Sequence, residues 1–389
     1  MADAVNSVVL SDRVRRSVQS ILANQHPSGA IIASPDFDQY HFCWLRDGSF
    51  IAYALDLVGK HDASGRYHAW VNSAVRNISG VIDDVIDRRQ RGKALDPTDM
   101  PPARFALDGT VVVDGWPSFQ IDGYGTWLWS LGQHLRLADG AAVSEEFRDS
   151  IVRVGRYLST FALTPCYDVW EESGSALHTS TLACVVGGLE TAGRLLGDES
   201  FLEAAASIAD HLKSDATRVG HYVKSSENED VDASVLWLGT PFRVVAPSDP
   251  HLAKTVAMVE DRLSLHGGLR RYPTDTYFGS GAWPVLTASL GWHYLSLGNL
   301  SEARRCRDWV ADHFDSDDRL GEQFGGDVRD PQHYFEWVDR WGPPAQELVW
   351  SHAMFVVLAT AIEGHDARVA SEGAAVSGVL PGPFTGEAD

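Results

Sequence analysis

The recurrence of apolar residues at helical spacing is the feature of this sequence that most limits its possible folds. The helical segments predicted from this periodicity are 7–24, 49–57, 67–86, 124–136, 147–162, 179–196, 201–212, 233–238, 252–265, 283–297, 301–314 and 346–362. Strand-like alternation is scarce, with 110–113 as its best candidate and 29–34 as a short extended piece. The predicted fold is therefore all-α.

The order of these segments predicts where function lies. The helices follow one another in pairs, and long loops rich in Gly, Trp, Asp and Arg precede every second helix. Long loops on one side of a rigid scaffold are a common place for an active site. No linker rich in Pro, Gly or Ser divides the 389 residues, so we expect a single domain over 1–389. Gly, Pro and Glu dominate the end of the chain, which predicts a flexible tail over about 371–389.

Composition excludes several classes of function. A net charge of −21 disfavours nucleic acids and anionic membrane surfaces as partners. No uninterrupted apolar run reaches membrane-spanning length, and the N-terminus lacks the pattern of a signal peptide. The four cysteines form no Cys-x-x-Cys pair, and the histidines lack ligand spacing. We therefore expect a cytoplasmic protein without a metal or cofactor, and leave its oligomeric state open.

A Trp-Glu-Glu triplet, Trp170 to Glu172, is the strongest candidate for chemistry. An indole offers a flat apolar face to a sugar ring, and burial beside it can raise the pKa of a carboxyl group until it donates protons near neutral pH. The competing interpretation is a solvated acidic helix start, because Glu is favoured in a first helical turn. A second carboxylate, Glu322 in a Gly-flanked loop, favours the catalytic interpretation.

Three other loops combine aromatic and charged residues. The first contains Tyr40, Trp44, Arg46 and Asp47, in which the Arg-Asp pair can donate to and accept from vicinal sugar hydroxyls. The second loop contains Gln120 and Asp122, for which a structural role is preferred. The third loop contains Arg271, Asp275 and Trp283.

In chain order these motifs resemble glycoside hydrolase family 15, the family of glucoamylases and related exo-acting α-glucosidases. The matching motifs are Tyr-x-x-x-Trp-x-Arg-Asp, Asp-x-Trp-Glu-Glu, Arg-Tyr-x-x-Asp-Thr-Tyr, Gly-Glu-Gln-Phe and Trp-Ser-His-Ala. The resemblance implies an (α/α)6 barrel of six inner and six outer helices, with a pocket at one end. The helical segments predicted from periodicity are compatible with that fold.

The resemblance also implies roles for individual residues. Glu171 would be the general acid, Glu322 the general base, and Tyr40 would help to place the attacking water. The substrate-binding residues would be Trp44, Arg46, Asp47, Trp170, Glu172, Arg271, Asp275 and Trp283. No cofactor or metal is needed for this chemistry.

The expected reaction is single-displacement, inverting hydrolysis of short α-glucosides from the non-reducing end. Phe278, where family members often carry tyrosine, favours α-1,6-linked substrates such as isomaltose over α-1,4-linked maltose or trehalose. Two interpretations from other classes also stay open: an inverting phosphorylase on the same barrel, and a non-catalytic sugar-sensing domain.

Overall fold

The computed structural model describes residues 12–138, 143–324 and 328–371, and helices dominate this part of the chain. The α-helices are α1 (Asp12–Ala23), α2 (Leu45–Leu57), α3 (His61–Asn77), α4 (Ser79–Gln90), α5 (Asp122–Leu137), α6 (Glu145–Phe161), α7 (Thr179–Leu196), α8 (Glu199–Asp215), α9 (Pro250–Leu263), α10 (Pro284–Ser296), α11 (Leu300–Asp312), α12 (Pro331–Trp341) and α13 (Val349–Ser371). Short 3-10 helices are η1 (Asp38–Tyr40), η2 (Pro97–Asp99), η3 (Ala233–Leu238) and η4 (Tyr277–Gly279).

Extended structure is limited to two small antiparallel pairs in the described residues. Strand β1 (Cys43–Trp44) pairs with β2 (Arg104–Phe105), and β3 (Ser264–Leu265) pairs with β4 (Gly268–Leu269). The predicted strand over 110–113 is wrong: only Val111 forms an isolated bridge, to Phe105, and Val113 is 94% exposed. Likewise, the extended piece over 29–34 contributes a single bridge between Gln25 and Ile31.

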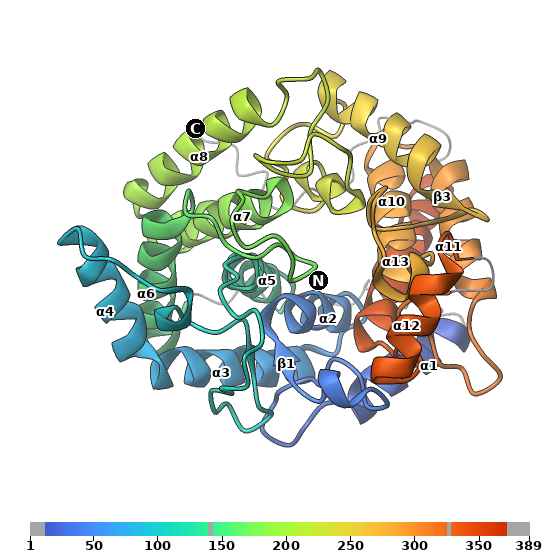
Figure 1. Cartoon of the computed structure of the whole chain (residues 1–389). Coiled ribbons are helices and arrows are strands. Elements are labelled where there is room, and N and C mark those ends of the chain that lie inside the picture. Colours follow the sequence, from blue (N-terminus) through green and yellow to red (C-terminus); the bar gives the residue numbers. More distant parts are fainter. Residues whose placement is uncertain (1–11, 139–142, 325–327, 372–389) are drawn as a thin grey trace.

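The helices form two concentric rings (Figure 1). In the inner ring α2 packs on α5, α5 on α7, α7 on η3, η3 on α10, α10 on α13, and α13 closes the ring on α2. The outer ring comprises α1, α3, α6, α8, α9 and α11, each packed against an inner element. This arrangement confirms the predicted all-α (α/α)6 barrel, with a six-residue 3-10 helix in one inner position.

Sequence composition explains which helices lie inside. Nearly every residue of α7 and α10 is buried, whereas α6 and α11 bury one stripe and expose the rest. The inner helices approach one another closely at positions occupied by glycine. A Cβ on Gly125 of α5 would lie 2.3 Å from the carbonyl oxygen of Cys184 on α7, so only glycine fits this crossing.

Aromatic side chains fill the centre of the inner ring. Phe50 of α2 lies 5.4–5.8 Å, between ring centroids, from Trp129 of α5, Trp237 of η3 and Trp350 of α13. All of these rings are buried. Because four inner elements contribute to this aromatic cluster, it fixes their spacing at the axis of the barrel.

Three predicted helices differ from those observed. The segment 67–86 is two helices, α3 and α4, separated at Ile78. The segment 233–238 is the 3-10 helix η3. The N-terminal part of the segment 7–24 lies outside the described residues, as do residues 372–389 of the predicted tail, whereas Ser371 ends α13. The expected single domain stays a prediction.

Helix α12 was not predicted because its apolar stripe is short and only partly buried. Tyr334, Trp337 and Val338 pack against the buried residues Phe37, Phe278 and Ala345, and none of the residues of α12 is fully buried. Its start was nevertheless signalled: Asp330 caps the backbone N–H groups of Gln332 and His333, and Pro331 occupies the first helical position. Across the described residues, no helix combines the length and the apolar character required to cross a membrane.

Candidate active site

A pocket of about 370 Å³ opens at one end of the barrel, where the inner helices begin. Its lining residues are Ala33, Phe37, Gln39, Tyr40, Trp44, Arg46, Asp47, Trp116, Pro117, Val169, Trp170, Glu171, Glu172, Arg271, Tyr277, Trp283, Glu322, Trp337, Arg340, Trp341, Leu348 and Trp350. Most lie in the first turns of inner helices or in the loops that precede them. Apolar indole faces interspersed with a few charged groups suit a ligand rich in hydroxyls.

Glu171 lies in a tight turn before α7, not in a helix. Its backbone has φ 66°, a left-handed conformation that is unfavourable for a non-glycine residue. One carboxylate oxygen of Asp168 holds the turn by accepting from the N–H groups of Trp170 and Glu172, both at 2.9 Å. The interpretation of an acidic helix start is therefore wrong, since α7 begins at Thr179.

Two neutral donors contact the carboxyl group of Glu171. The indole of Trp44 donates to Oε1, and Nε2 of Gln120 donates to the same oxygen at 3.1 Å. Burial raises the pKa of Glu171, while the guanidinium of Arg46 and the two donors oppose this rise. A carboxyl group with a raised pKa suits a proton donor.

Glu322 belongs to another loop and lines the same pocket. The hydroxyl of Tyr40 donates to Oε1 at 2.7 Å, and the Tyr277 hydroxyl lies 2.8 Å from that of Tyr40. Oε2 is buried and has no hydrogen-bond partner in the described part of the chain. Burial raises the pKa of Glu322 to about 7, while the bond from Tyr40 and the charge of Arg271 act in the opposite direction.

Arg46 and Asp47 occupy the first turn of α2 at the pocket wall. Arg46 Nη1 donates to Asp122 at 3.0 Å and to Gln120 at 3.2 Å, and the guanidinium lies over the Trp350 ring. Nε of Arg46 lies 3.2 Å from Oδ1 of Asp47, but neither atom makes a geometrically sound hydrogen bond. The two side chains therefore form a buried ion pair at the pocket wall.

Arg271 is the centre of the opposite wall. It donates to Asp275 through Nε at 3.1 Å and to Glu172 through Nη2 at 3.1 Å. Tyr272 donates to the other oxygen of Glu172, and the Trp170 and Trp283 rings stand 5.6 Å apart. Asp275 is absent from the pocket lining, so its predicted part in binding would act through the orientation of Arg271.

The structure adds lining residues that sequence reasoning did not select, mainly Trp116, Tyr277 and Trp350. Trp337, Arg340 and Trp341 also line the pocket; they belong to the segment 330–341, which the sequence suggests as a wall for the second sugar. Gln120 and Asp122, for which only a structural role was preferred, contact the Glu171 and Arg46 side chains directly. Their signal in the sequence was weak because short polar residues before a helix usually serve as caps.

A buried ion-pair network centred on Lys224 stabilises the turn that carries Glu171. Lys224 Nζ lies 2.8 Å from Oδ2 of Asp168 and 2.8 Å from Oδ2 of Asp232, and the Trp170 indole donates to Asp232 at 2.9 Å. Lys224 and both carboxylates are buried. The network therefore ties the turn that carries Glu171 to the start of η3.

An (α/α)6 barrel whose pocket combines a buried and a half-buried glutamate with arginines and tryptophans defines a glycoside hydrolase. The model of glycosyl hydrolases family 15 matches residues 9–323. The isomaltose glucohydrolase of Kribbella flavida is 37% identical over 357 residues, covering 90% of this chain and 92% of that protein. The chain belongs to glycosyl hydrolases family 15.

Solved structures agree with this assignment. A wild-type glycosidase superposes with a TM-score of 0.88 at 36% identity, covering 93% of this chain and 99% of the other. A variant of a glycosidase with the same similarity was solved in complex with glucose. A bacterial glucoamylase complexed with acarbose matches with a TM-score of 0.71 at 17% identity, covering 91% of this chain and 56% of the other, which shows the shared fold.

Proposed function

We propose that this enzyme is an inverting, exo-acting α-glucosidase that releases β-glucose from the non-reducing end of short α-1,6-linked glucosides, with isomaltose as its main substrate. The isomaltose glucohydrolase of Kribbella flavida, similar over nearly the full length of both chains, supports this choice of substrate. The observation that carries the mechanism is the presence of two glutamates, on loops 151 residues apart, in one pocket with different hydrogen-bond partners.

Glu171 is the general acid in this proposal. Burial raises its pKa, which favours the protonated form, and from that form it protonates the glycosidic oxygen as the bond to the anomeric carbon breaks. Trp44 and Gln120 fix the orientation of this carboxyl group. After proton transfer, the nearby guanidinium of Arg46 stabilises the carboxylate.

Glu322 is the general base. Its unpartnered Oε2 accepts a proton from the attacking water, while Tyr40 holds Oε1. Attack on the face opposite the leaving group inverts the anomeric carbon, and an inverting pair needs about 6.5–9.5 Å between carboxyl groups to accommodate the water. Neither carboxylate forms a covalent bond to the sugar.

Arg46 and Asp47 bind hydroxyls of the terminal glucose, and Trp44, Trp170 and Trp283 enclose its ring. The second sugar then contacts the outer wall made by Glu172, Arg271 and the α12 residues Trp337 and Arg340. An α-1,6 bond contains an additional rotatable carbon, so it directs this sugar toward a different part of the wall than an α-1,4 bond does. Phe278 packs against α12 through ring contacts with Tyr334 and Trp337.

The other classes fit the pocket less well. A phosphorylase needs cationic groups that are free to bind phosphate, but Arg271 is engaged by Asp275 and Glu172, and Arg46 by Asp122. A non-catalytic sugar sensor does not need both glutamates in the pocket. We also propose a cytoplasmic location, because the four cysteines are buried free thiols, as in a reducing compartment.

Glucose release from isomaltose, maltose, trehalose and soluble starch, measured in parallel, tests the proposal. We expect the highest kcat/KM for isomaltose, and NMR of the first product should show β-glucose. Equal or better use of maltose and starch would reject the isomaltose assignment and leave the hydrolase intact. α-Glucose as the first product would reject the inverting mechanism.

A further inference from the structure

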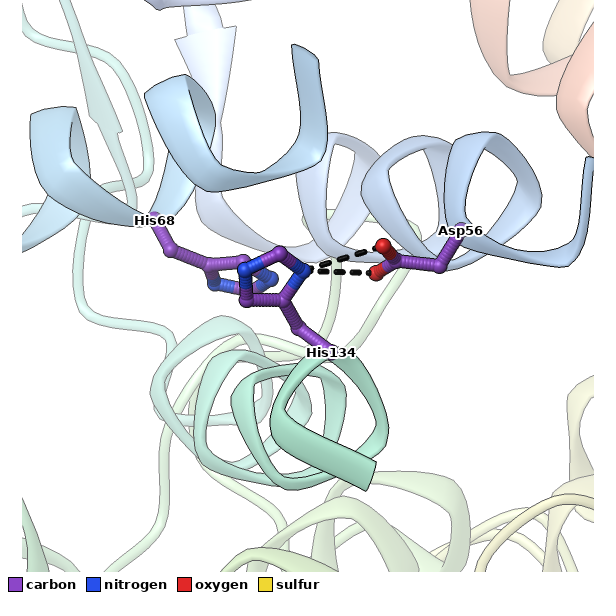
Figure 2. A group of neighbouring side chains, drawn as sticks. All are labelled: Asp56, His68 and His134. Atoms are coloured by element: carbon purple, nitrogen blue, oxygen red, sulfur yellow. Dashed lines mark hydrogen bonds and ion pairs between the residues drawn. The ribbon is translucent and has the colours of Figure 1, made fainter. Parts of the chain in front are cut away.

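A second cluster of chemically reactive side chains, shown in Figure 2, comprises Asp56, His68 and His134 and lies near the C-terminal ends of two inner helices, away from the pocket. Asp56 occupies the last turn of α2, His134 the last turn of α5, and His68 the middle of the outer helix α3. Asp47 marks the pocket end of α2, and the nine residues to Asp56 correspond to roughly 14 Å along the helix axis. The cluster is therefore separate from the catalytic machinery.

The carboxylate of Asp56 is the centre of this cluster. Nδ1 of His134 lies 2.9 and 3.1 Å from its two oxygens, and Nδ1 of His61 lies 2.8 Å from Oδ1. Ser64 donates to Oδ2 at 2.7 Å. The side chain of Asp56 is fully buried and lies within hydrogen-bond distance of the side chains of His134, His61 and Ser64.

His68 is the member of the cluster whose polar atoms are buried without hydrogen-bond partners in the described residues. It is completely buried, and neither of its ring nitrogens has a hydrogen-bond partner among the described residues. Its ring faces that of His134, with 5.0 Å between centroids and 35° between planes. Both nitrogens of this buried imidazole are therefore available to a ligand.

Asp56, His68 and His134 each offer one ligand atom, and these atoms lie within 4.8 Å of one another. Two imidazoles and one carboxylate form a donor set that suits borderline metal ions, Zn²⁺ in particular. We propose that these three residues bind one divalent transition-metal ion, with Zn²⁺ as the best fit, in a structural site that fastens α2, α3 and α5 together.

Binding changes the cluster in a defined way. Metal–ligand bonds of about 2.0–2.2 Å in a tetrahedral site place neighbouring ligands about 3.3 Å apart, so the His68 ring moves toward the carboxylate. The contact between His134 and Asp56 is replaced by two bonds to the ion, and His134 Nδ1 gives up its proton. The fourth position lies on the side of His61, whose side chain is 36% exposed, and is filled by that imidazole or by water.

The sequence predicted no metal because its histidines show no ligand spacing. The three ligands lie 12, 66 and 78 residues apart in pairs and converge only through the packing of α2, α3 and α5. The site would add a cross-link between an outer helix and two inner helices. It supplies no step of the hydrolysis.

Metal content and thermal stability of the tag-free full-length chain test the proposal. After chelation and re-addition of Zn²⁺ and removal of the excess, we expect about one ion per chain by elemental analysis and a Tm a few degrees above that of the chelated protein. Substitution with Co²⁺ should give the visible absorption of a low-coordinate N/O site.

Three variants make the result specific. His68→Gln and His134→Gln should each lose the bound ion and the rise in Tm; if His68→Gln does not fold, the partly exposed His134→Gln decides. His211→Gln is the matched control, because His211 forms a simple pair with Asp215 at 3.4 Å without a third ligand. It should retain the ion.

Equal metal content in the wild type and His134→Gln, or no binding by the wild type, would overturn the proposal. Isomaltose hydrolysis by the chelated enzyme is measured alongside. Its persistence is expected whether or not the metal site exists, so failure of the metal proposal and failure of the proposed function give different results.

Discussion

At the scale of single residues, two neighbouring glutamates have different surroundings. Glu171 contacts Trp44 and Gln120 inside the pocket, whereas Glu172 is held by Arg271 and Tyr272. The first environment buries a carboxyl group beside neutral donors and raises its pKa. The second pairs it with a cation. Adjacent residues of the same type can therefore have separate functions.

Glutamine substitutions should separate these functions. Glu171→Gln and Glu322→Gln each remove a proton-transfer group at nearly constant volume, so we expect kcat to fall about a thousandfold or more while Tm stays near or above that of the wild type. Glu172→Gln should mainly raise KM. Steady-state kinetics on isomaltose measure all three. An inactive Glu172→Gln beside an active Glu171→Gln would show that the acid is assigned to the wrong residue.

The hydroxyl of Tyr40 should control the pH dependence through Glu322. Its hydrogen bond stabilises the ionised carboxylate and counters the effect of burial. Tyr40→Phe removes that bond, so the pKa of Glu322 rises above about 7, and the acidic limb of kcat/KM should move up by roughly 1–2 pH units.

Tyr294→Phe provides a control for that experiment, because Tyr294 also donates to a glutamate, Glu260, away from the pocket. Its acidic limb should coincide with that of the wild type. If the acidic limb of the kcat/KM profile of Tyr40→Phe coincides with that of the wild type, Glu322 is not the base whose ionisation limits activity.

At the scale of structural elements, the turn before α7 depends on the buried network of Lys224. Lys224→Met leaves Asp168 and Asp232 buried without their cation, which we expect to cost about 3–5 kcal/mol of unfolding free energy. Because Asp168 holds the Glu171 turn, kcat should fall as well. Chemical denaturation and kinetics on isomaltose measure the two effects.

Lys213→Met is the matched control, since Lys213 forms only a surface contact with Asp210 at 3.9 Å. It should change unfolding free energy by less than about 1 kcal/mol. If both lysine variants behave alike, the network does not position the acid.

These elements also show what the sequence could predict. The inner helices α5, α7 and α10 were predicted to within two residues at each end, because continuous burial produces a strong apolar signal. The start of α2 and the end of α13 were missed by four and nine residues. Glu171 and Glu322 were found through local motifs that resemble a known family. Lys224 carries no local signal, because its partner Asp168 lies 56 residues away and the pair exists only in the folded chain. Helix α12 has a short apolar face that is only partly buried, and η3 is too short for its period to distinguish a 3-10 helix.

At the scale of the whole molecule, the pocket should make stability depend on pH. Burial raises the pKa of Glu322 from 4.5 to about 7 and that of Asp47 from 3.8 to about 6. The folded state therefore binds more protons than the unfolded state between about pH 4 and 7, and the unfolding free energy falls as pH rises through this window.

Glu322→Gln isolates one contribution to this dependence. Relative to wild type, its unfolding free energy should increase by about 3 kcal/mol from below pH 4.5 to above pH 7, in proportion to the pKa shift. Urea unfolding at a series of pH values gives the difference. A constant difference across this range would show that Glu322 titrates as it does in the unfolded chain.

The aromatic cluster around Phe50 closes the barrel behind Trp350, which lines the pocket. An oligosaccharide cannot pass through the barrel along its axis, because aromatic rings from four inner elements fill that space. Each released glucose must therefore leave by the opening through which the substrate came, and the shortened chain must withdraw before the glucose can escape. We therefore expect multichain attack, without processive movement along one molecule, and competition between free glucose and each new substrate for the same opening.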